Sequence, residues 1–198
     1  KIIGITGTNG KTTVAALIQS CLHSLGHMCG YIGTLGVGIY DYDHSDLTTP
    51  SNFKLHQAVA DFYQKGVKFV VIEVSSHAIA QDRIAGIHFD ATMFTNLTQD
   101  HLDYHGDMKN YGEIKSRLFT EIESKIKIIN CINDFGKKLF SEIQEDVIQI
   151  TNTLVPNEDK GLFLNIEKSS AHGLGYSVSI QSSWGHKKFN IQLIGAFN

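Results

Sequence analysis

Apolar residues along the first 150 positions follow two alternating patterns, short continuous runs and longer stretches with three- and four-residue spacing. The continuous runs predict strands at residues 2–6, 29–32, 69–74, 91–95, 126–132 and 147–150. The spaced stretches predict helices at about residues 14–25, 51–65, 108–121 and 134–143. Strands that are apolar throughout are typical of a parallel sheet covered on both faces. The pattern therefore predicts an α/β fold in three layers, with right-handed crossovers and a mostly parallel sheet.

The pattern changes after about residue 160. Polar and apolar residues alternate at 176–180 and again at 189–193, with Trp184 and Gly185 between them. This period of two is typical of half-exposed strands joined by a turn. We therefore expect a small antiparallel hairpin or sheet near the C-terminus.

Composition narrows the classes of protein that fit. Hydrophobic residues make up 42% and charged residues 19%, which is ordinary for a globular protein. The net charge of -3 argues against nucleic acid as the main partner, and no apolar run approaches the length of a membrane span. Cys21, Cys29 and Cys131 lie far apart without metal-ligand spacing, so we expect buried, reduced cysteines in a cytoplasmic protein.

The first predicted strand is followed by the run Gly7-Thr8-Asn9-Gly10-Lys11-Thr12, and then by the first predicted helix. A glycine-rich loop between a strand and a helix N-terminus directs backbone N–H groups at an anion. Lys11 would reach the outer phosphates of a nucleotide, and the Thr12 hydroxyl would hold magnesium. The run therefore predicts a phosphate loop (P-loop) that binds ATP with Mg²⁺.

Two further features belong to the same edge of the predicted sheet. Glu73 is the one charged residue in an apolar strand, near the end where ligands bind in open parallel sheets. We interpret it as a second magnesium ligand, the alternative being an ordinary acid at a strand end. The polar segment 96–105 follows the next strand, and by itself it fits a metal and phosphate site or a solvated loop equally well.

Together these motifs resemble the Mur ligases of peptidoglycan synthesis. The resemblance rests on residues 6–13, on the run Glu-Val-Ser-Ser-His at 73–77, and on residues 95–106. With Gln81 and Arg83 after the second run, the chain looks most like MurE-type members. These add the third amino acid, meso-diaminopimelate or L-lysine, to UDP-N-acetylmuramoyl-L-alanyl-D-glutamate.

The resemblance implies a reaction in which ATP activates a carboxylate as an acyl phosphate, which the incoming amine then attacks. It implies nucleotide contacts along the loop and catalytic roles for Lys11, Glu73, His101 and Lys115. The magnesium ligands would be Thr12, Glu73, His101 and an N-carbamate on Lys115, which without the resemblance would be interpreted as a solvated surface lysine. The implied nucleotide-binding set is Gly7, Thr8, Asn9, Gly10, Lys11, Thr12 and Thr13, and the implied substrate-binding set is Thr48, Thr49, Ser75, Gln81 and Arg83.

Two positions depart from the family pattern. Leu47 stands where a polar asparagine usually precedes the threonine pair, and Ile132 and Asn133 stand in a region that commonly carries aspartates. The first departure puts one substrate contact in doubt, and the second puts a nucleotide contact in doubt. Neither affects the implied magnesium ligands.

Residues 1–198 match the central ATPase domain of the family. The N-terminal UDP-binding and C-terminal amino-acid-binding domains are not in this sequence, so we interpret it as a piece of a longer chain. We expect it to be a monomer that binds Mg-ATP weakly and does not ligate alone. The alternatives are another Mur ligase, a folylpolyglutamate synthase-like ligase, or a P-loop ATPase that ligates nothing.

Overall fold

The structure is a computed structural model, and it describes residues 1–143, 147–152, 162–173 and 175–192. The chain divides into two compact units, Lys1–Ile126 and Lys127–Asn198. The first contains β1 (Ile2–Thr6), α1 (Lys11–Ser24), β2 (Cys29–Gly33), β3 (Gly36–Gly38), β4 (Tyr42–Asp43), α2 (Asn52–Gln64), β5 (Phe69–Glu73), α3 (Ser76–Ala80), β6 (Phe89–Phe94), α4 (Leu102–His105) and α5 (Met108–Thr120). Strand β7 (Ser124–Asn130) crosses the boundary.

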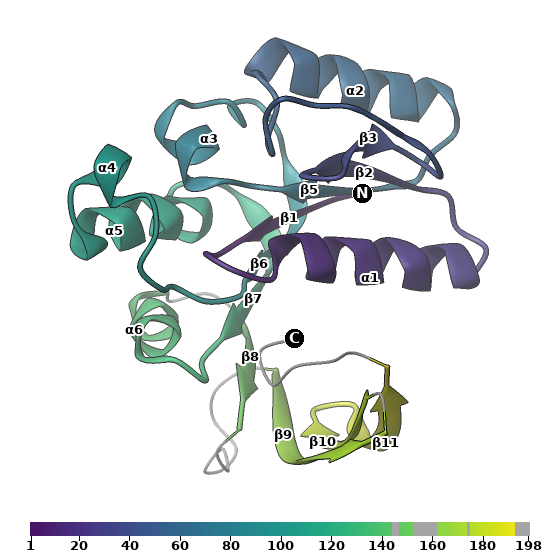
Figure 1. Ribbon diagram of the computed structural model, residues 1–198, viewed down its shortest axis with the longest axis vertical. Helices are drawn as coiled ribbons and strands as arrows, with labels where there is room; N and C mark the ends of the chain where they lie inside the picture. The colour runs from purple at the N-terminus through teal and green to yellow at the C-terminus, as the bar shows by residue number, and fades with distance from the viewer. Residues whose placement is uncertain (144–146, 153–161, 174, 193–198) are drawn as a thin grey trace. The chain divides into compact units, whose positions relative to one another are not determined.

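The sheet of the first unit has the strand order β6-β1-β5-β2-β3-β4. Strands β6, β1, β5 and β2 are parallel, whereas β3 and β4 add an antiparallel edge. Helices α1 and α2 lie on opposite sides of these strands, which gives three layers (Figure 1). The predicted α/β fold with a mostly parallel sheet is therefore confirmed.

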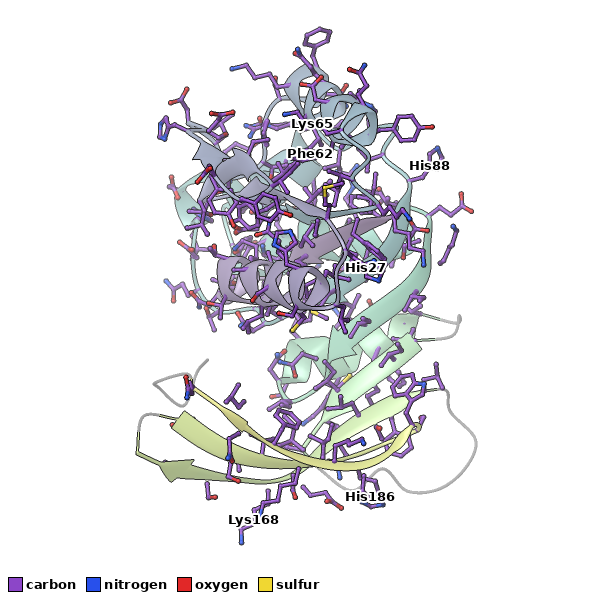
Figure 2. The ribbon with its side chains drawn as sticks, turned by 90° about the vertical axis from the view of Figure 1, so that its right-hand side faces the viewer. His27, Phe62, Lys65, His88, Lys168 and His186 are labelled. Atoms are coloured by element: carbon purple, nitrogen blue, oxygen red, sulfur yellow. The ribbon has the colours of Figure 1, made fainter. Side chains whose placement is uncertain are left out.

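The two faces of this sheet are packed by different residues. On one face, Ile5, Tyr31 and Val71 form a buried cluster with Ala15 of α1. On the other face, Phe62 of α2 (labelled in Figure 2) lies so close to β2 that a Cβ at Gly30 would be 2.6 Å from its ring. Successive residues of one strand thus pack against helices on opposite faces of the sheet. This explains why the apolar residues of these strands form continuous runs.

The second unit contains α6 (Asp134–Glu142), β8 (Val147–Thr151), β9 (Phe163–His172), β10 (Gly175–Ser182) and β11 (Gly185–Ile191). Strands β7, β8 and β9 are parallel, and β9, β10 and β11 form a curved antiparallel sheet (Figure 2). The predicted hairpin is confirmed, with Tyr176 opposite Ile191 and Ser182 opposite Gly185. Leu193 of the predicted strand and the closing residues 195–198 lie outside the described residues.

Several short elements were not predicted. Strands β3 and β4 occupy a glycine-rich and polar stretch that we interpreted as loop, and α3 and α4 are single turns within the motif segments. Strand β9 was not predicted either. Elements of two to five residues carry too few apolar positions to establish a period, so their existence depends on tertiary contacts. Strand β9 has ten residues, but its polar and apolar residues do not alternate regularly.

The cysteine prediction was partly wrong. Cys29 and Cys131 are buried and carry free thiols as expected, but Cys21, also a free thiol, is exposed on α1. Its place in the helical spacing put it near the apolar face, yet the buried stripe of α1 is narrow and contains Ala15 and Gln19. Within the described parts of the chain, no helix is long and apolar enough to cross a membrane.

Candidate functional site

The phosphate loop connects β1 to α1 through two glycines with positive φ. Gly7 has φ 144° and Gly10 has φ 81°, both values that side chains disfavour. Gly10 is the N-cap residue of α1, so the N–H groups of the first helical turn face the loop. A Cβ on Gly7 would lie 1.9 Å from Thr95 Oγ1, which leaves no room for any other residue there.

The segment that follows β6 holds this loop in place. The Thr8 N–H donates to Asn96 O at 2.9 Å, and the Asn9 N–H donates to Asn96 Oδ1 at 2.9 Å. Thr95 Oγ1 donates to Asn9 O at 2.7 Å, and the Thr98 N–H donates to Thr8 Oγ1 at 3.0 Å. The first half of the segment 96–105 is therefore a scaffold for the phosphate loop.

Two lysines meet at one carbonyl oxygen of the loop. Lys11 Nζ donates to Gly7 O at 2.9 Å and to Thr8 O at 2.8 Å, and Lys115 Nζ donates to Gly7 O at 3.0 Å. Lys115 is only 1% exposed, with its Nζ 4.6 Å from the centre of the Tyr111 ring. Burial, together with the nearby charge of Lys11, lowers the pKa of Lys115 to about 7. Burial also lowers the pKa of Lys11.

Glu73 is fully buried at the end of β5, beside the start of α1. Thr12 Oγ1 donates to Glu73 Oε2 at 2.8 Å, and Thr34 donates to both carboxylate oxygens, through its N–H to Oε1 and its hydroxyl to Oε2. The Tyr31 hydroxyl also donates to Oε1. The two residues expected to hold the first magnesium, Thr12 and Glu73, are thus in direct contact.

His101 follows the segment that holds the loop and is more open to solvent than Glu73. Its backbone has φ 53°, its side chain is 49% exposed, and its Nε2 lies 3.5 Å from Asp100 Oδ2. The His77 ring is 5.0 Å away between ring centres, and the Tyr111 ring is 6.4 Å away. His101 is therefore near Tyr111, whose ring also contacts Lys115. In the part of the chain that the structure describes, no hydrogen bond, ion pair or ring contact joins His101 to Glu73 or Lys115.

The expected substrate residues form one connected group at the end of β5. Thr49 Oγ1 donates to Glu73 O at 2.6 Å and accepts the Ser75 N–H at 3.0 Å. Arg83 Nη1 donates to Thr49 O at 3.0 Å, and its Nε donates to Gln81 Oε1 at 3.0 Å. Thr48 Oγ1 lies 3.3 Å from Thr34 Oγ1. The residues expected to bind the substrate are thus connected to Glu73 through hydrogen bonds. Leu47, which precedes them, is 43% exposed.

Three site residues escaped prediction from the sequence. Tyr31 and Thr34 hold Glu73, and Tyr111 lies under Lys115 with its hydroxyl 3.2 Å from Thr8 Oγ1. A tyrosine within the apolar run 29–32 was the available signal for the first of them. Asn133, one of the departures from the family pattern, caps α6 by accepting the Gly136 N–H at 2.8 Å.

The residues around the loop fit a magnesium ion at Thr12 and Glu73, but an unmodified Lys115 does not fit one. The Thr12 hydroxyl and the Glu73 carboxylate are oxygen ligands of the kind that this hard cation prefers. Lys115 as an ammonium cannot bind a cation, because it has no lone pair to offer. Among the residues that the structure describes, no group of three or more histidine, cysteine, aspartate or glutamate side chains could hold a metal.

Comparison with known proteins matches this chain to Mur ligases. The family model for the "Mur ligase middle domain" matches residues 5–198. The UDP-N-acetylmuramoyl-L-alanyl-D-glutamate–2,6-diaminopimelate ligase of Coxiella burnetii is 40% identical over 205 residues, covering 100% of this chain and 41% of that protein. The chain thus spans about two fifths of the length of such relatives.

Solved structures agree with this result. A structure of a UDP-N-acetylmuramoyl-L-alanyl-D-glutamate–2,6-diaminopimelate ligase matches with a TM-score of 0.86 and 30% identity, over 100% of this chain and 40% of that one. A structure described as an FPGS-AMPPCP-folate complex matches with a TM-score of 0.69 and 17% identity, over 100% of this chain and 54% of that one, and so shares the fold alone. By its sequence and by its fold, this chain belongs to the Mur ligase middle domain family.

Proposed function

We propose that this chain is the ATP-binding domain, residues 1–198, of a cytoplasmic, monomeric MurE-type ligase. The whole enzyme would join 2,6-diaminopimelate to UDP-N-acetylmuramoyl-L-alanyl-D-glutamate, as the names of the relatives say of those proteins. The observation that carries the proposal is the contact of Thr12 with Glu73 at 2.8 Å, beside a phosphate loop that presents Lys11. The three free thiols support a reducing compartment.

The site residues have distinct tasks in this proposal. Lys11 and the N–H groups at the start of α1 would neutralise the γ-phosphate as a carboxylate oxygen of the dipeptide bonds to its phosphorus and the bond to ADP breaks. The amine of the incoming amino acid then attacks the acyl carbon, phosphate leaves, and the amine loses a proton. Thr12 and Glu73 would hold magnesium, which would supply further positive charge at the phosphates.

Lys115 is suited to carry the proposed carbamate. A carbamate forms when a neutral amine bonds to the carbon of CO₂ and loses a proton, so the amine must be unprotonated. Burial beside Lys11 favours the neutral amine, because it lowers the pKa of Lys115 to about 7. The resulting carboxylate-like group would be an oxygen ligand near His101, at the position proposed for the second magnesium.

Arg83 is the cation that the substrate would meet at the end of β5. Its guanidinium already donates to Gln81 and to the Thr49 carbonyl, which fixes the plane of its donors. A fixed fork of this kind is suited to a carboxylate or a pyrophosphate. We propose that Thr48, Thr49 and Ser75 complete the contacts with the muramoyl dipeptide.

Phosphate release by the full-length parent tests the proposal. With ATP and Mg²⁺, we expect release only when UDP-N-acetylmuramoyl-L-alanyl-D-glutamate and an amino acid are both present, and more with meso-diaminopimelate than with L-lysine. Lys11→Ala should abolish nucleotide binding, whereas Lys54→Ala, at an exposed position of α2, should not. Hydrolysis that ignores the dipeptide would instead indicate an ATPase that ligates nothing.

The carbamate has its own test. Carbon-13 NMR with labelled bicarbonate should give one protein-bound carbamate signal that is absent from Lys115→Arg and present in Lys54→Ala. A labelled signal that persists in Lys115→Arg would contradict the assignment to Lys115.

A further inference from the structure

The carboxylate of Glu73 is held unequally at its two oxygens. Oε2 accepts two hydroxyl groups, those of Thr12 at 2.8 Å and of Thr34 at 3.2 Å. Oε1 accepts the Thr34 N–H at 3.0 Å and the Tyr31 hydroxyl. The side chains of Thr12 and Thr34 are not buried, and their hydroxyls can turn to other partners. The backbone N–H cannot turn away, and the Tyr31 oxygen is held by a fully buried ring. The orientation of the carboxylate is therefore decided at Oε1.

We propose that Tyr31 is a positioning residue that fixes the Glu73 carboxylate with Oε2 directed at the Thr12 hydroxyl, and so at magnesium. The inference rests on the function proposed above, in which Thr12 and Glu73 hold the ion. Without the Tyr31 hydroxyl, Oε1 keeps one donor and the carboxylate can rotate about its last bond. A metal ligand that is not held by such a partner binds its ion less tightly.

Tyr31 is itself unable to move away from Glu73. It is fully buried in β2, within the cluster formed by Ile5, Ala15, Cys29 and Val71. Its oxygen also accepts the Leu35 N–H at 3.3 Å, and its ring lies 5.1 Å from the ring of Tyr42. The phenol is thus fixed from the core side and from the loop that follows β2.

Gly33 gives independent support for this arrangement. A Cβ at this position would be 2.3 Å from Glu73 Oε1 and 2.6 Å from the Tyr31 oxygen. The backbone of β2 therefore passes directly over the hydrogen bond, and only glycine leaves room for it. Two residues of β2 thus act on the same oxygen of Glu73. The Tyr31 hydroxyl donates to it, and Gly33, which has no side chain, leaves room for this hydrogen bond.

The test measures how strongly magnesium supports nucleotide binding in the full-length parent. Calorimetric titration with AMPPCP, in excess Mg²⁺ and in EDTA, gives two values of Kd for each variant. In Tyr31→Phe we expect Kd in Mg²⁺ to rise about 10-fold, the lower end of the loss seen when metal-supporting residues are removed, with Kd in EDTA unchanged. A defect in folding would change both values.

Tyr42→Phe is the matched control. It removes a hydroxyl that donates to Gln19 Oε1 at 2.6 Å, in the same region, without touching Glu73. We expect its two Kd values to match those of the wild type. If thermal unfolding in EDTA shows that Tyr31→Phe does not fold, Gly33→Ala replaces it, with the same expected loss.

The outcomes separate the two proposals. A wild-type ratio of the two Kd values in Tyr31→Phe would overturn the role of Tyr31 and leave the proposed function intact. A wild-type parent whose AMPPCP binding ignores Mg²⁺ would overturn the metal role of Thr12 and Glu73 in the proposed function.

Discussion

At the scale of single residues, burial sets the reactivity of side chains that have the same chemistry elsewhere. Burial raises the pKa of Cys29 and of Cys131 to about 11, whereas Cys21 is exposed. The thiolate is the reactive form, so the two buried cysteines are protected both by their protonation and by lack of access.

This difference predicts selective labelling. At about pH 8, a maleimide should modify Cys21 within minutes in the native chain and leave Cys29 and Cys131 unmodified, because hardly any of their thiols are ionised. All three should react after unfolding in guanidinium chloride. Mass spectrometry of tryptic peptides measures the sites, and Cys21→Ser should remove the fast reaction. Fast native labelling of Cys29 would contradict the described packing of β2.

Lys115 predicts a dependence of stability on pH. The unfolded side chain keeps its proton up to about pH 10.5, whereas the folded one releases it near pH 7. Between these values unfolding takes up a proton, so the free energy of unfolding should rise with pH, by about 1.4 kcal/mol per pH unit at most. Below about pH 7 both states are protonated and the folded state bears the full cost of the buried charge.

Urea unfolding in CO₂-free buffers measures this effect as the difference between the wild type and Lys115→Met. Methionine fills similar space without a charge, so the difference should favour the variant most at low pH and shrink as the pH rises. A difference that does not change with pH would contradict the low pKa of Lys115.

At the scale of elements, the turn from β1 into α1 depends on its two glycines for different reasons. Gly10→Ala places a Cβ in open space, so its cost is the left-handed backbone alone, about 1–2 kcal/mol. Gly7→Ala also forces a Cβ against Thr95, which is part of the scaffold of the loop. We therefore expect a clearly larger loss of stability in Gly7→Ala, measured by thermal unfolding. Equal losses in the two variants would contradict the close approach at Gly7.

Helix α5 carries both Tyr111 and Lys115, and its start is fixed by a side chain. Asp107 precedes the helix and accepts the Asn110 N–H at 2.7 Å. Asp107→Ala should cost about 1 kcal/mol of stability, since the first turn loses this acceptor, while Asp107→Asn should cost much less. Urea unfolding of both variants measures the difference, and an alanine variant as stable as the asparagine variant would show that the cap contributes nothing.

The elements also show what a sequence can predict. The long elements α1, α2 and α5 and the central strands followed their apolar periods to within a few residues, because burial on known faces imposes those periods. Lys115 shows the limit: by pattern alone it belonged to a solvated surface, yet the packing of α5 makes it 1% exposed. Tyr31 shows the same limit. Its hydroxyl donates to Glu73 because β2 pairs with β5, and no local sequence pattern reveals that pairing.

At the scale of the whole molecule, the described chain contains a nucleotide loop and the residues proposed for one substrate, but it spans about two fifths of the length of its relatives. We expect this chain alone to bind Mg-ATP weakly and to form no amide bond. Calorimetry measures the first property, and phosphate release with the dipeptide and diaminopimelate measures the second. Robust ligation by these 198 residues would contradict the proposal that this chain is only the ATP-binding domain of the ligase.

The carbonyl oxygen of Gly7 accepts hydrogen bonds from both Lys11 and Lys115. A change in the position or charge of one amine therefore affects the other. In the proposed function, a phosphate that draws Lys11 away would relieve Lys115 of a nearby like charge and add an anion, and both changes would favour a proton on Lys115. Nucleotide and proton would then strengthen each other's binding, and each would oppose the proposed carbamate, which needs the neutral amine. By thermodynamic reciprocity, the carbamate would weaken nucleotide binding by the same factor, unless a divalent cation bound with it. The Gly7 carbonyl would thus link CO₂, metal and nucleotide in one set of coupled equilibria.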